Sequence, residues 1–381
     1  MNTEIISGKY SSATIYTTDN EQYRIDPYAI NQIQMLCNNE ALSGSRIRIM
    51  PDVHPGKVGT IGFTATVGEK LMPMLIGIDI GCGMTVAKIR RAKKEWQRLD
   101  SVIRENVPAG SLIRKKKHAQ SGEFDFDKLR CAAHIQEKRC AQSLGTLGGG
   151  NHFIEVDADG DSLYLVIHSG SRHLGKEVTD HYMTEGQKAL REKGIDLPYE
   201  LTYLEGNLLT DYLHDVCVAQ EYAALNRRII VSEILKGMKW KAEEVWTCEH
   251  NYIAADDQTI DLFGKPMLRK GSISAMKGER VIIPINMRDG IILGSGLGNK
   301  EWNCSAPHGA GRIMKREDVK KSFTVSAYKA EMKGIYTTCI SPDTLDEAPF
   351  AYRSLDDIAG VIAETIRIDT IARPLYSFKA Q

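Results

Sequence analysis

Short apolar runs rich in β-branched residues occur in the first quarter of the chain. They cover residues 46–50, 61–67, 75–80 and 84–89, and glycine or proline separates one run from the next. Runs of this length and composition are typical of strands in a packed sheet. We therefore expect four strands here, with the sequence Asp79-Ile80-Gly81-Cys82 at a strand end and its turn.

Two later segments have the periodicity of amphipathic helices. From Asn207 to about Lys236, apolar residues recur at a spacing of three to four. A second helix is predicted to begin at Ser354, where Ser354-Leu355-Asp356-Asp357 is typical of a capping box, and its apolar stripe continues to Ile366. Together with the strands, these segments predict a mixed α and β protein. We expect the long helix to be scaffold rather than part of a site.

The composition excludes several classes of protein. Of the 381 residues, 42% are hydrophobic, which is enough to bury a large core, and 49 basic against 49 acidic residues give a net charge of zero. A neutral chain lacks the overall basic field of a nucleic-acid coat protein, so a polyanion would have to be held locally. No apolar run approaches the roughly 18 residues that span a bilayer, so the sequence predicts no membrane role.

The cysteines and the first residues indicate a compartment. The eight cysteines do not have the dense spacing of a disulfide framework, and the opening residues lack the basic and apolar regions of a signal peptide. We therefore expect a reducing, cytoplasmic location.

One polar stretch, residues 108–126, is predicted to be a mobile surface loop. It contains the basic run Arg114-Lys115-Lys116-Lys117-His118. A solvated charged segment explains such a run adequately, and the alternative is a clamp on a nucleic-acid backbone.

Candidate chemistry begins with an aspartate and a cysteine three residues apart. Asp79 and Cys82 lie among Gly77, Gly81 and Gly83, which let the backbone turn sharply and approach a ligand. A lone cysteine is more often a small buried hydrophobic residue. The nearby carboxylate and glycines favour a metal ligand instead, and a thiolate between two cations could bridge them.

Two further segments place a histidine beside groups that suit phosphate. The glycines of Leu144-Gly145-Thr146-Leu147-Gly148-Gly149-Gly150 precede Asn151 and His152, and a glycine-rich backbone can form a nest for phosphate oxygens. In His168-Ser169-Gly170-Ser171-Arg172, hydroxyls and a guanidinium able to grip a phosphate follow the histidine.

The last two candidate histidines differ in their surroundings. His250 lies in Glu249-His250-Asn251-Tyr252, and small residues at positions 309–311 follow His308. We expect a helix to begin near Arg312 and to direct its N-terminus at an anion beside His308. His308 could then act as a nucleophile toward phosphate, although a structural role also fits the residues.

The remaining histidines have weaker contexts. His181 and His214 fall on helical faces and are expected to be structural, whereas His54 lies in a rigid turn bounded by prolines and is a candidate for a functional role.

These residues predict a metal-dependent phosphate site and leave its reaction open. An enzyme that forms a phosphoramidate on His308 and a dimetal phosphatase or phosphodiesterase would use the same ligands, with His308 as nucleophile in the first and water in the second. A metal-stabilised RNA-binding module is a third reading, which the neutral charge and the lack of aromatic runs disfavour. Histidine, cysteine and aspartate would also suit Zn²⁺ or Co²⁺.

Many of these motifs, in this order, resemble those of the RtcB family of RNA ligases. The resemblance extends from about residue 45 to the end and rests on residues 50–57, Asp79 and Cys82, residues 148–155, 168–172, 269–271, 308–312 and 346–349. It implies an α+β fold of the RtcB type, with one large domain over residues 1–381 in which packed β-sheets and flanking helices surround a central metal cleft. It also implies two Mn²⁺ ions and a GTP-dependent joining of an RNA 3'-phosphate or 2',3'-cyclic phosphate to a 5'-hydroxyl end, in RNA repair or tRNA splicing.

The resemblance also implies roles for individual residues. His308 would become guanylylated, and Cys82 would be shared between the two ions. Arg172 would hold the RNA phosphate, with His54 and Lys57 as further candidates. The implied metal ligands are Asp79, Cys82, His152, His168 and His250. The implied nucleotide contacts are Asn151, Phe153, Glu155, Asn251, Pro284, Met287, Gly309, Ala310, Gly311, Tyr352 and Lys379. RNA would be the main partner, and an activator of the archease type is a candidate partner.

One strip departs from the family pattern. Where much of the family has Pro-Gly-Ser-Met-Gly, this chain has Pro284-Ile285-Asn286-Met287-Arg288-Asp289-Gly290 and keeps only the proline and the methionine. The strictness of guanine preference is therefore open. Arg353 replaces a usual lysine and keeps its charge, and the short chain suggests a bacterial branch that serves RNA repair.

Overall fold

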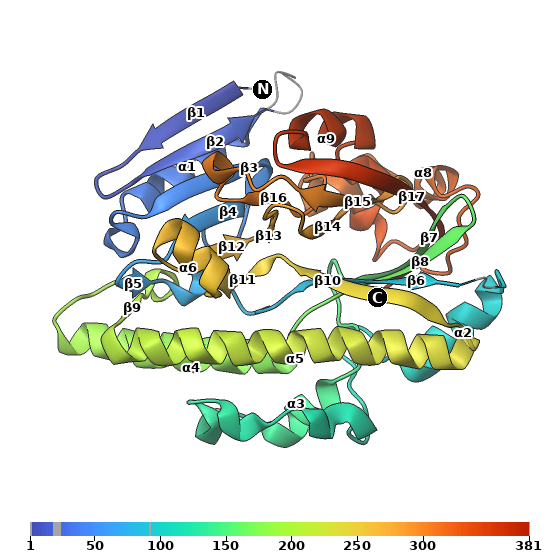
Figure 1. Ribbon diagram of the computed structural model, residues 1–381, viewed down its shortest axis with the longest axis horizontal. Coiled ribbons are helices and arrows are strands. Elements are labelled where there is room, and N and C mark those ends of the chain that lie inside the picture. Colours follow the sequence, from blue (N-terminus) through green and yellow to red (C-terminus); the bar gives the residue numbers. More distant parts are fainter. Residues whose placement is uncertain (1, 18–23, 91–92, 381) are drawn as a thin grey trace.

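The computed structural model describes residues 2–17, 24–90 and 93–380, and two large sheets organise them (Figure 1). Among these residues, the first sheet has six strands, in the order β1 (Asn2–Ser7), β2 (Ser12–Thr17), β3 (Arg46–Pro55), β4 (Thr60–Thr66), β12 (Met267–Lys270) and β11 (Asn251–Ala254). β2 and β3 are parallel, and the other neighbours are antiparallel.

The second sheet has seven strands within the described ranges, and all of its neighbours are antiparallel. Its order is β10 (Ala242–Glu249), β6 (Gly83–Ile89), β8 (Ser162–Ser169), β7 (Phe153–Asp159), β17 (Ile366–Lys379), β15 (Gly290–Gly296) and β14 (Arg280–Asn286). Two small ribbons complete the strands, β5 (Lys70–Leu71) with β9 (Leu204–Glu205) and β13 (Ser272–Ser274) with β16 (Ser305–Pro307).

Helices cover these sheets. The longest, α5, runs along the lower side of the molecule in Figure 1, next to α4, and the segment containing α3 lies below it. The helices are α1 (Pro27–Cys37), α2 (Trp96–Asn106), α3 (Glu137–Ser143), α4 (Arg172–Glu192), α5 (Gly206–Met238), α6 (Asp257–Phe263), α7 (Arg316–Ser322), α8 (Val325–Glu331) and α9 (Leu355–Ile362).

Among the described residues, the three largest apolar cores connect the layers. The first lies between the six-stranded sheet and helices α1, α4 and α5, and it contains Ile47, Phe63 and Tyr222. The other two lie on opposite faces of the seven-stranded sheet, so that Phe153 of β7 faces one core and Ile154 faces the other. This alternation follows from the two-residue period of a strand that is buried on both faces.

The α+β class predicted from the sequence is confirmed, and so is the long helix, which extends from Gly206 to Met238. The predicted start of the C-terminal helix is also correct, because Ser354 and Asp357 form a capping box. That helix ends at Ile362, however, and Ile366 begins β17, so the apolar stripe belongs to two different elements.

The strand predicted for residues 75–80 is wrong. Pro73–Leu75 is a 3₁₀ helix, and a turn without strand pairing follows it as far as Cys82. Gly77 and Gly81 have φ angles of +84° and +71°, which a strand does not contain. Leu75, Ile76 and Ile80 are therefore buried through a turn that packs on α5, whereas Ile78 is exposed.

Sheet pairing joins distant parts of the chain. β17, near the C-terminus, lies between β7 and β15, and β12 pairs with β4. This interleaving supports the single domain expected for residues 1–381, which remains a prediction. Within the described part of the chain, none of the helices has the length and hydropathy needed to span a bilayer.

Candidate metal and nucleotide site

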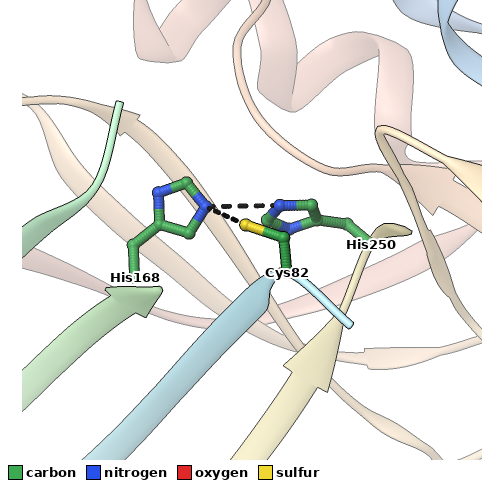
Figure 2. Close-up of side chains that lie close together, drawn as sticks. All are labelled: Cys82, His168 and His250. Carbon is green, nitrogen blue, oxygen red and sulfur yellow. Dashed lines mark hydrogen bonds between the residues drawn. The ribbon is translucent and has the colours of Figure 1, made fainter. Parts of the chain in front are cut away.

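Three adjacent strands bring three of the predicted metal ligands to one sheet edge. Cys82 immediately precedes β6, His168 is the second-to-last residue of β8, and His250 immediately follows β10. Because β6 is antiparallel to both neighbours, its start lies beside their ends, and the pairings of Gly83 with Ser169 and with Glu249 fix this register. The three side chains point toward one another in Figure 2.

Their donor atoms are close enough to share a cation. The Cys82 Sγ lies 3.4 Å from the Nε2 of His168, which in turn lies 3.2 Å from the Nε2 of His250. Cys82 Sγ is also 3.5 Å from the Nε2 of His152, and that nitrogen is 3.0 Å from the Oδ2 of Asp79. The five residues form two groups, Cys82–His168–His250 and Asp79–Cys82–His152, which share Cys82.

Backbone carbonyls orient two of the rings. The Nδ1 of His152 donates to the carbonyl of Leu147 at 2.8 Å, and the Nδ1 of His168 donates to that of Asn151 at 3.1 Å. Each Nε2 therefore faces the cluster, as in metal-binding histidines whose second nitrogen has a fixed partner. The Nδ1 of His250 is buried and has no hydrogen-bond partner among the described residues.

The charges of the cluster also fit a cation. Burial lowers the pKa of His168 and His250 well below the usual range and raises that of Cys82 well above it, so without a cation these groups are neutral. Burial raises the pKa of Asp79, but its contacts with His152 and Arg172 outweigh this and hold it at about 2. A cation among these donors would be stabilised by the Asp79 carboxylate and would favour the thiolate of Cys82.

The turn that carries Asp79 fits tightly against the start of α4. The Oδ1 of Asp79 accepts a hydrogen bond of 3.0 Å from the backbone nitrogen of Ser171. A Cβ atom at Gly170 would lie only 2.1 Å from the same oxygen, so only glycine fits there.

The glycine-rich loop and Arg172 also meet. A Cβ atom at Gly148 would lie 2.2 Å from the Nη1 of Arg172, whose Nε donates to Thr146 Oγ1 at 3.1 Å and whose Nη2 donates to the Gly110 carbonyl at 3.2 Å. This places the Arg172 guanidinium beside the Asp79 group. The role of the loop and of Arg172 toward phosphate remains a prediction.

His308 lies next to the cluster, just after β16. Its ring centroid is 5.0 Å from that of His250. The Oδ2 of Asp52 accepts hydrogen bonds from the Nδ1 of His308 at 2.7 Å and from its backbone nitrogen at 3.2 Å. With Nδ1–H donated to Asp52, Nε2 is the ring nitrogen that carries a lone pair.

The helix predicted near Arg312 is wrong. Helix α7 begins at Arg316 and has seven residues, and Arg312 instead forms a β-bridge with Tyr352. The turn after His308 is held by Asp52, because a Cβ atom at Gly311 would lie 2.9 Å from the Asp52 carbonyl oxygen. Helix α7 therefore begins after this turn rather than at Arg312.

A cavity joins His308 to most of the residues that the family resemblance assigns to the nucleotide. Asn151, Phe153, Glu155, Pro284, Met287, Gly309, Ala310, Gly311, Tyr352 and Lys379 line it, together with His54, His168 and His250. Asn251 is not among its lining residues, and its Oδ1 instead accepts a hydrogen bond of 3.0 Å from the backbone nitrogen of Gly271.

A buried charged network forms one end of this cavity. The Nζ of Lys379 donates to Glu347 Oε2 at 2.7 Å and to the Asn151 carbonyl at 3.1 Å, and the Tyr352 hydroxyl donates to the same Glu347 oxygen at 2.8 Å. Burial raises the pKa of Glu347, but Lys379 and Arg316 outweigh it and bring it to about 2.

Residues 284–290, the strip that departs from the family pattern, form part of another wall of this cavity. Asn286 closes the turn between β14 and β15, because its Oδ1 accepts from the backbone nitrogens of Arg288 and Asp289 at 3.0 and 2.9 Å. Ile285 and Met287 line the cavity beside it.

The two further RNA candidates lie in different environments. His54 lines the cavity, and its Nδ1 donates to the Asp52 carbonyl at 2.9 Å. Burial lowers the pKa of His54 to about 4, so the ring is neutral at physiological pH. Lys57 is exposed.

The polar stretch 108–126 is anchored at two points. Arg114 donates to the carbonyls of Asn106, Leu144 and Gly145, and His118 lies 3.3 Å from Glu233 of α5. The three lysines between them are exposed, and mobility of the stretch remains a prediction.

Sequence reasoning did not assign roles to Asp52 and Glu347. Both lie in motifs that carried the family resemblance, but the residues beside each carboxylate in the sequence give no sign of its partner. A buried charged group almost always has a partner. A prediction that these two positions are buried could therefore have pointed to them.

Comparison with known proteins agrees with this geometry. The family model described as tRNA-splicing ligase RtcB matches residues 35–126 and 113–380. The chain is 30% identical to RNA-splicing ligase RtcB of Escherichia coli (strain K12), over 84% of this chain and 87% of that protein. It is 28% identical to RNA-splicing ligase RtcB2 of another Escherichia coli strain, over 98% of both chains, and 28% identical to tRNA-splicing ligase RtcB of Aeropyrum pernix, over 82% and 83%. The matched residues include the cluster, His308 and the cavity between them, and the chain belongs to the RtcB family.

Proposed function

We propose that this protein is an RNA ligase that joins an RNA 3'-phosphate or 2',3'-cyclic phosphate end to a 5'-hydroxyl end, in RNA repair or tRNA splicing. The observation that supports this most is the position of His308. Its ring contacts the candidate metal cluster on one side and opens to the cavity on the other, while Asp52 holds its Nδ1. A metal cluster alone would serve many phosphate reactions, whereas a histidine held in this way is suited to nucleophilic attack.

The proposed cofactors are two Mn²⁺ ions and GTP. Asp79, Cys82, His152, His168 and His250 would hold the ions, which would supply positive charge that offsets the negative charge of the phosphates. Support for two ions comes from the two donor groups that share Cys82. The choice of Mn²⁺ and of GTP follows the family.

His308 would carry the guanylyl group between GTP and RNA. Its Nε2 attacks the α-phosphate of GTP, a P–N bond forms, and the bond to the β-phosphate breaks to release pyrophosphate. An oxygen of the RNA 3'-phosphate then attacks the same phosphorus, and the P–N bond breaks. Finally the 5'-hydroxyl oxygen attacks the RNA phosphorus, GMP leaves, and a phosphodiester remains. A cyclic phosphate would first be hydrolysed in the same site.

The cavity residues have proposed roles toward these groups. Phe153, Glu155, Tyr352 and Lys379 would contact the nucleotide, as would the 309–311 turn and the 284–287 strip. Arg172, on the other side of the cluster, would hold the RNA phosphate, and His54 and Lys57 are further candidates. Asn251 would act indirectly, through Gly271, whose position faces the His308 ring.

A cytoplasmic location and an archease-type activator complete the proposal. All eight cysteines are free, which suits a reducing compartment. The effect of an activator is measurable as the amount of joined product formed with and without it.

A ligation assay tests the proposal. A labelled RNA with a 3'-phosphate is incubated with a 5'-hydroxyl RNA, Mn²⁺ and either GTP or no nucleotide, with wild type and with the matched variant His308→Asn. We expect a joined product only for wild type with GTP. Release of inorganic phosphate without GTP, by both proteins alike, would instead indicate the dimetal phosphatase, which the comparisons do not favour.

A further inference from the structure

Arg227 is a fully buried arginine on the face of α5 that packs against the candidate metal site. Each of its five N–H groups has an acceptor. The Nε donates to Thr85 Oγ1 at 3.2 Å, and Nη1 donates to the carbonyls of Gly81 and Ser169 at 2.6 and 3.0 Å. Nη2 donates to Thr247 Oγ1 and to Glu249 Oε1, both at 3.1 Å.

Three of these acceptors are direct sequence neighbours of candidate ligands. Gly81 precedes Cys82, Ser169 follows His168, and Glu249 precedes His250. One side chain thus connects the three segments that carry the Cys82–His168–His250 group, although those segments are far apart in the sequence.

The guanidinium has the right chemistry for this connection. It is planar and its donors have a fixed spacing, so it sets the distances between the groups that accept from it. The carboxylate of Glu249 balances its charge, which a fully buried cation requires. A lysine offers three donors on one nitrogen and cannot reach all three segments at once.

Asn226, the residue before Arg227 on α5, also holds a segment that leads to a candidate ligand. The Oδ1 of Asn226 accepts from the backbone nitrogens of Gly145 and Thr146, and its Nδ2 donates to the carbonyls of Thr146 and Gly170. Asn226 therefore fixes the glycine-rich loop that leads to His152. Asn226 and Arg227 are consecutive residues of a helix expected to be only scaffold. Together they contact the turn that carries Asp79 and Cys82, the glycine-rich loop before His152, and the segments of His168 and His250.

We propose that Arg227 is a positioning residue of the metal centre, which holds Cys82, His168 and His250 at the spacing that an ion needs before the ion binds. The proposal rests on the metal centre of the proposed function and on none of its later steps. Replacing a residue that orients metal ligands without binding the metal itself typically lowers metal affinity by about 10- to 100-fold.

The test compares Arg227→Lys with Arg228→Lys in the full-length protein. Arg228 is the next residue of α5, is exposed and pairs with Glu123, so its replacement controls for the change of side chain on the same helix. Mn²⁺ affinity is measured by titration of the apo-protein. Co²⁺ is then added as a spectroscopic probe, because the thiolate-to-metal absorption and the ligand-field bands report how Cys82 and the histidines are arranged around the ion.

We expect Arg227→Lys to bind Mn²⁺ about 10- to 100-fold more weakly than wild type and to have an altered Co²⁺ spectrum, while Arg228→Lys matches wild type in both. A folded Arg227→Lys protein with wild-type affinity and spectrum would overturn the proposal. If that variant does not fold, Glu249→Gln decides, since it removes only the charge partner of Arg227. We expect weaker Mn²⁺ binding and an altered spectrum, and wild-type values would equally overturn the proposal. A wild-type protein that binds Mn²⁺ but joins no RNA would refute the ligase function and leave the role of Arg227 intact.

Discussion

The carboxylate behind His308 defines the chemistry of that ring. Asp52 is fully buried, and one of its oxygens accepts from both the ring Nδ1 and the backbone nitrogen of residue 308. A buried carboxylate in this position selects one tautomer and holds the ring plane, as the aspartate of a Ser-His-Asp triad does for its histidine. The neighbouring backbone is equally constrained, since a Cβ atom at Gly62 would lie 3.0 Å from the other oxygen of Asp52.

Replacing Asp52 with asparagine is expected to slow guanylylation by roughly 10²- to 10⁴-fold, because the amide can donate to Nδ1 and stabilise the wrong tautomer. The rate of covalent GMP incorporation, measured by intact mass over time, checks this. Mn²⁺ affinity should stay unchanged, since Asp52 is outside the ligand cluster. A variant that incorporates GMP at the wild-type rate would show that Asp52 does not control the tautomer.

His54 gives a pH dependence to stability. Burial lowers its pKa from 6.5 to about 4, so between these values the unfolded chain binds more protons than the folded protein. Its contribution to stability is complete above the unfolded value and is lost as the pH falls toward the folded value. We expect the free energy of unfolding of wild type to fall about 2 kcal/mol more than that of His54→Asn between about pH 7.5 and pH 5.

Urea titrations of both proteins at the two pH values measure this difference. Since other histidines are common to both proteins, the comparison isolates His54. Parallel losses of stability in the two proteins would mean that His54 titrates normally in the folded state.

Single residues were also where the sequence was most informative about the site. Asp79, Cys82 and His168 each lie among glycines or hydroxyl residues that have no use in an apolar core, and the structure brings all three together. Asp52 and Glu347 gave no such sign, because their partners, His308 and Lys379, are hundreds or tens of residues away and become neighbours only through tertiary packing.

At the scale of elements, the turn that carries Asp79 and Cys82 depends on its contact with α5. Gly77 and Gly81 both have positive φ, but only Gly81 is crowded. A Cβ atom there would lie 2.8 Å from Ala223 Cβ and 3.0 Å from Gln220 Cα, whereas one at Gly77 would meet nothing within 4 Å. A substitution at Gly77 therefore measures the cost of backbone strain alone, whereas one at Gly81 adds the cost of steric contact with α5.

Gly77→Ala is expected to cost about 1 kcal/mol of stability through backbone strain alone. Gly81→Ala should cost about 1 to 3 kcal/mol more and weaken metal binding, because the added methyl group moves Cys82 away from the histidines. Urea unfolding and Mn²⁺ titration of both variants provide the measurements. Equal losses in the two variants would show that α5 does not fix this turn.

Elements were predicted well where the periodic segment was long and poorly where it was short. The helix over residues 206–238 has many turns of consistent spacing, so its pattern is unambiguous. The run 75–80 has only six residues, and an apolar run of this length fits either a strand or a buried turn. The positive φ angles of Gly77 and Gly81 fit only the turn. Ile366 continued a helical stripe by coincidence and begins β17 instead.

At the scale of the whole molecule, the candidate ligands come from parts of the chain that are distant in sequence. They come from a turn, a glycine-rich loop and the ends of two strands, spread from residue 79 to residue 250. The order β10-β6-β8-β7-β17-β15-β14 that assembles them could not be predicted, because strand pairing between distant segments leaves no local pattern. The α+β class needed only the kinds of element present and was predictable.

Metal removal is therefore expected to lower the stability of the whole fold. A ligand that binds only the folded state stabilises it by about 4 kcal/mol at 1,000 times its Kd, so saturation with Mn²⁺ should raise Tm by several degrees over the chelated protein. Thermal unfolding with excess Mn²⁺ and with a chelator measures the effect, and His168→Ala should show much less of it. Identical Tm values in both conditions would contradict a metal centre made from these segments.

The central claim, that His308 carries a nucleotide beside a metal centre, is tested most directly by intact-mass spectrometry after incubation with GTP and Mn²⁺. We predict that wild type gains the mass of one GMP group, that peptide mapping places this group on His308, and that His308→Ala and chelated wild type gain nothing. An adduct that persists in His308→Ala, or wild type that gains no mass with both Mn²⁺ and GTP present, would contradict the account.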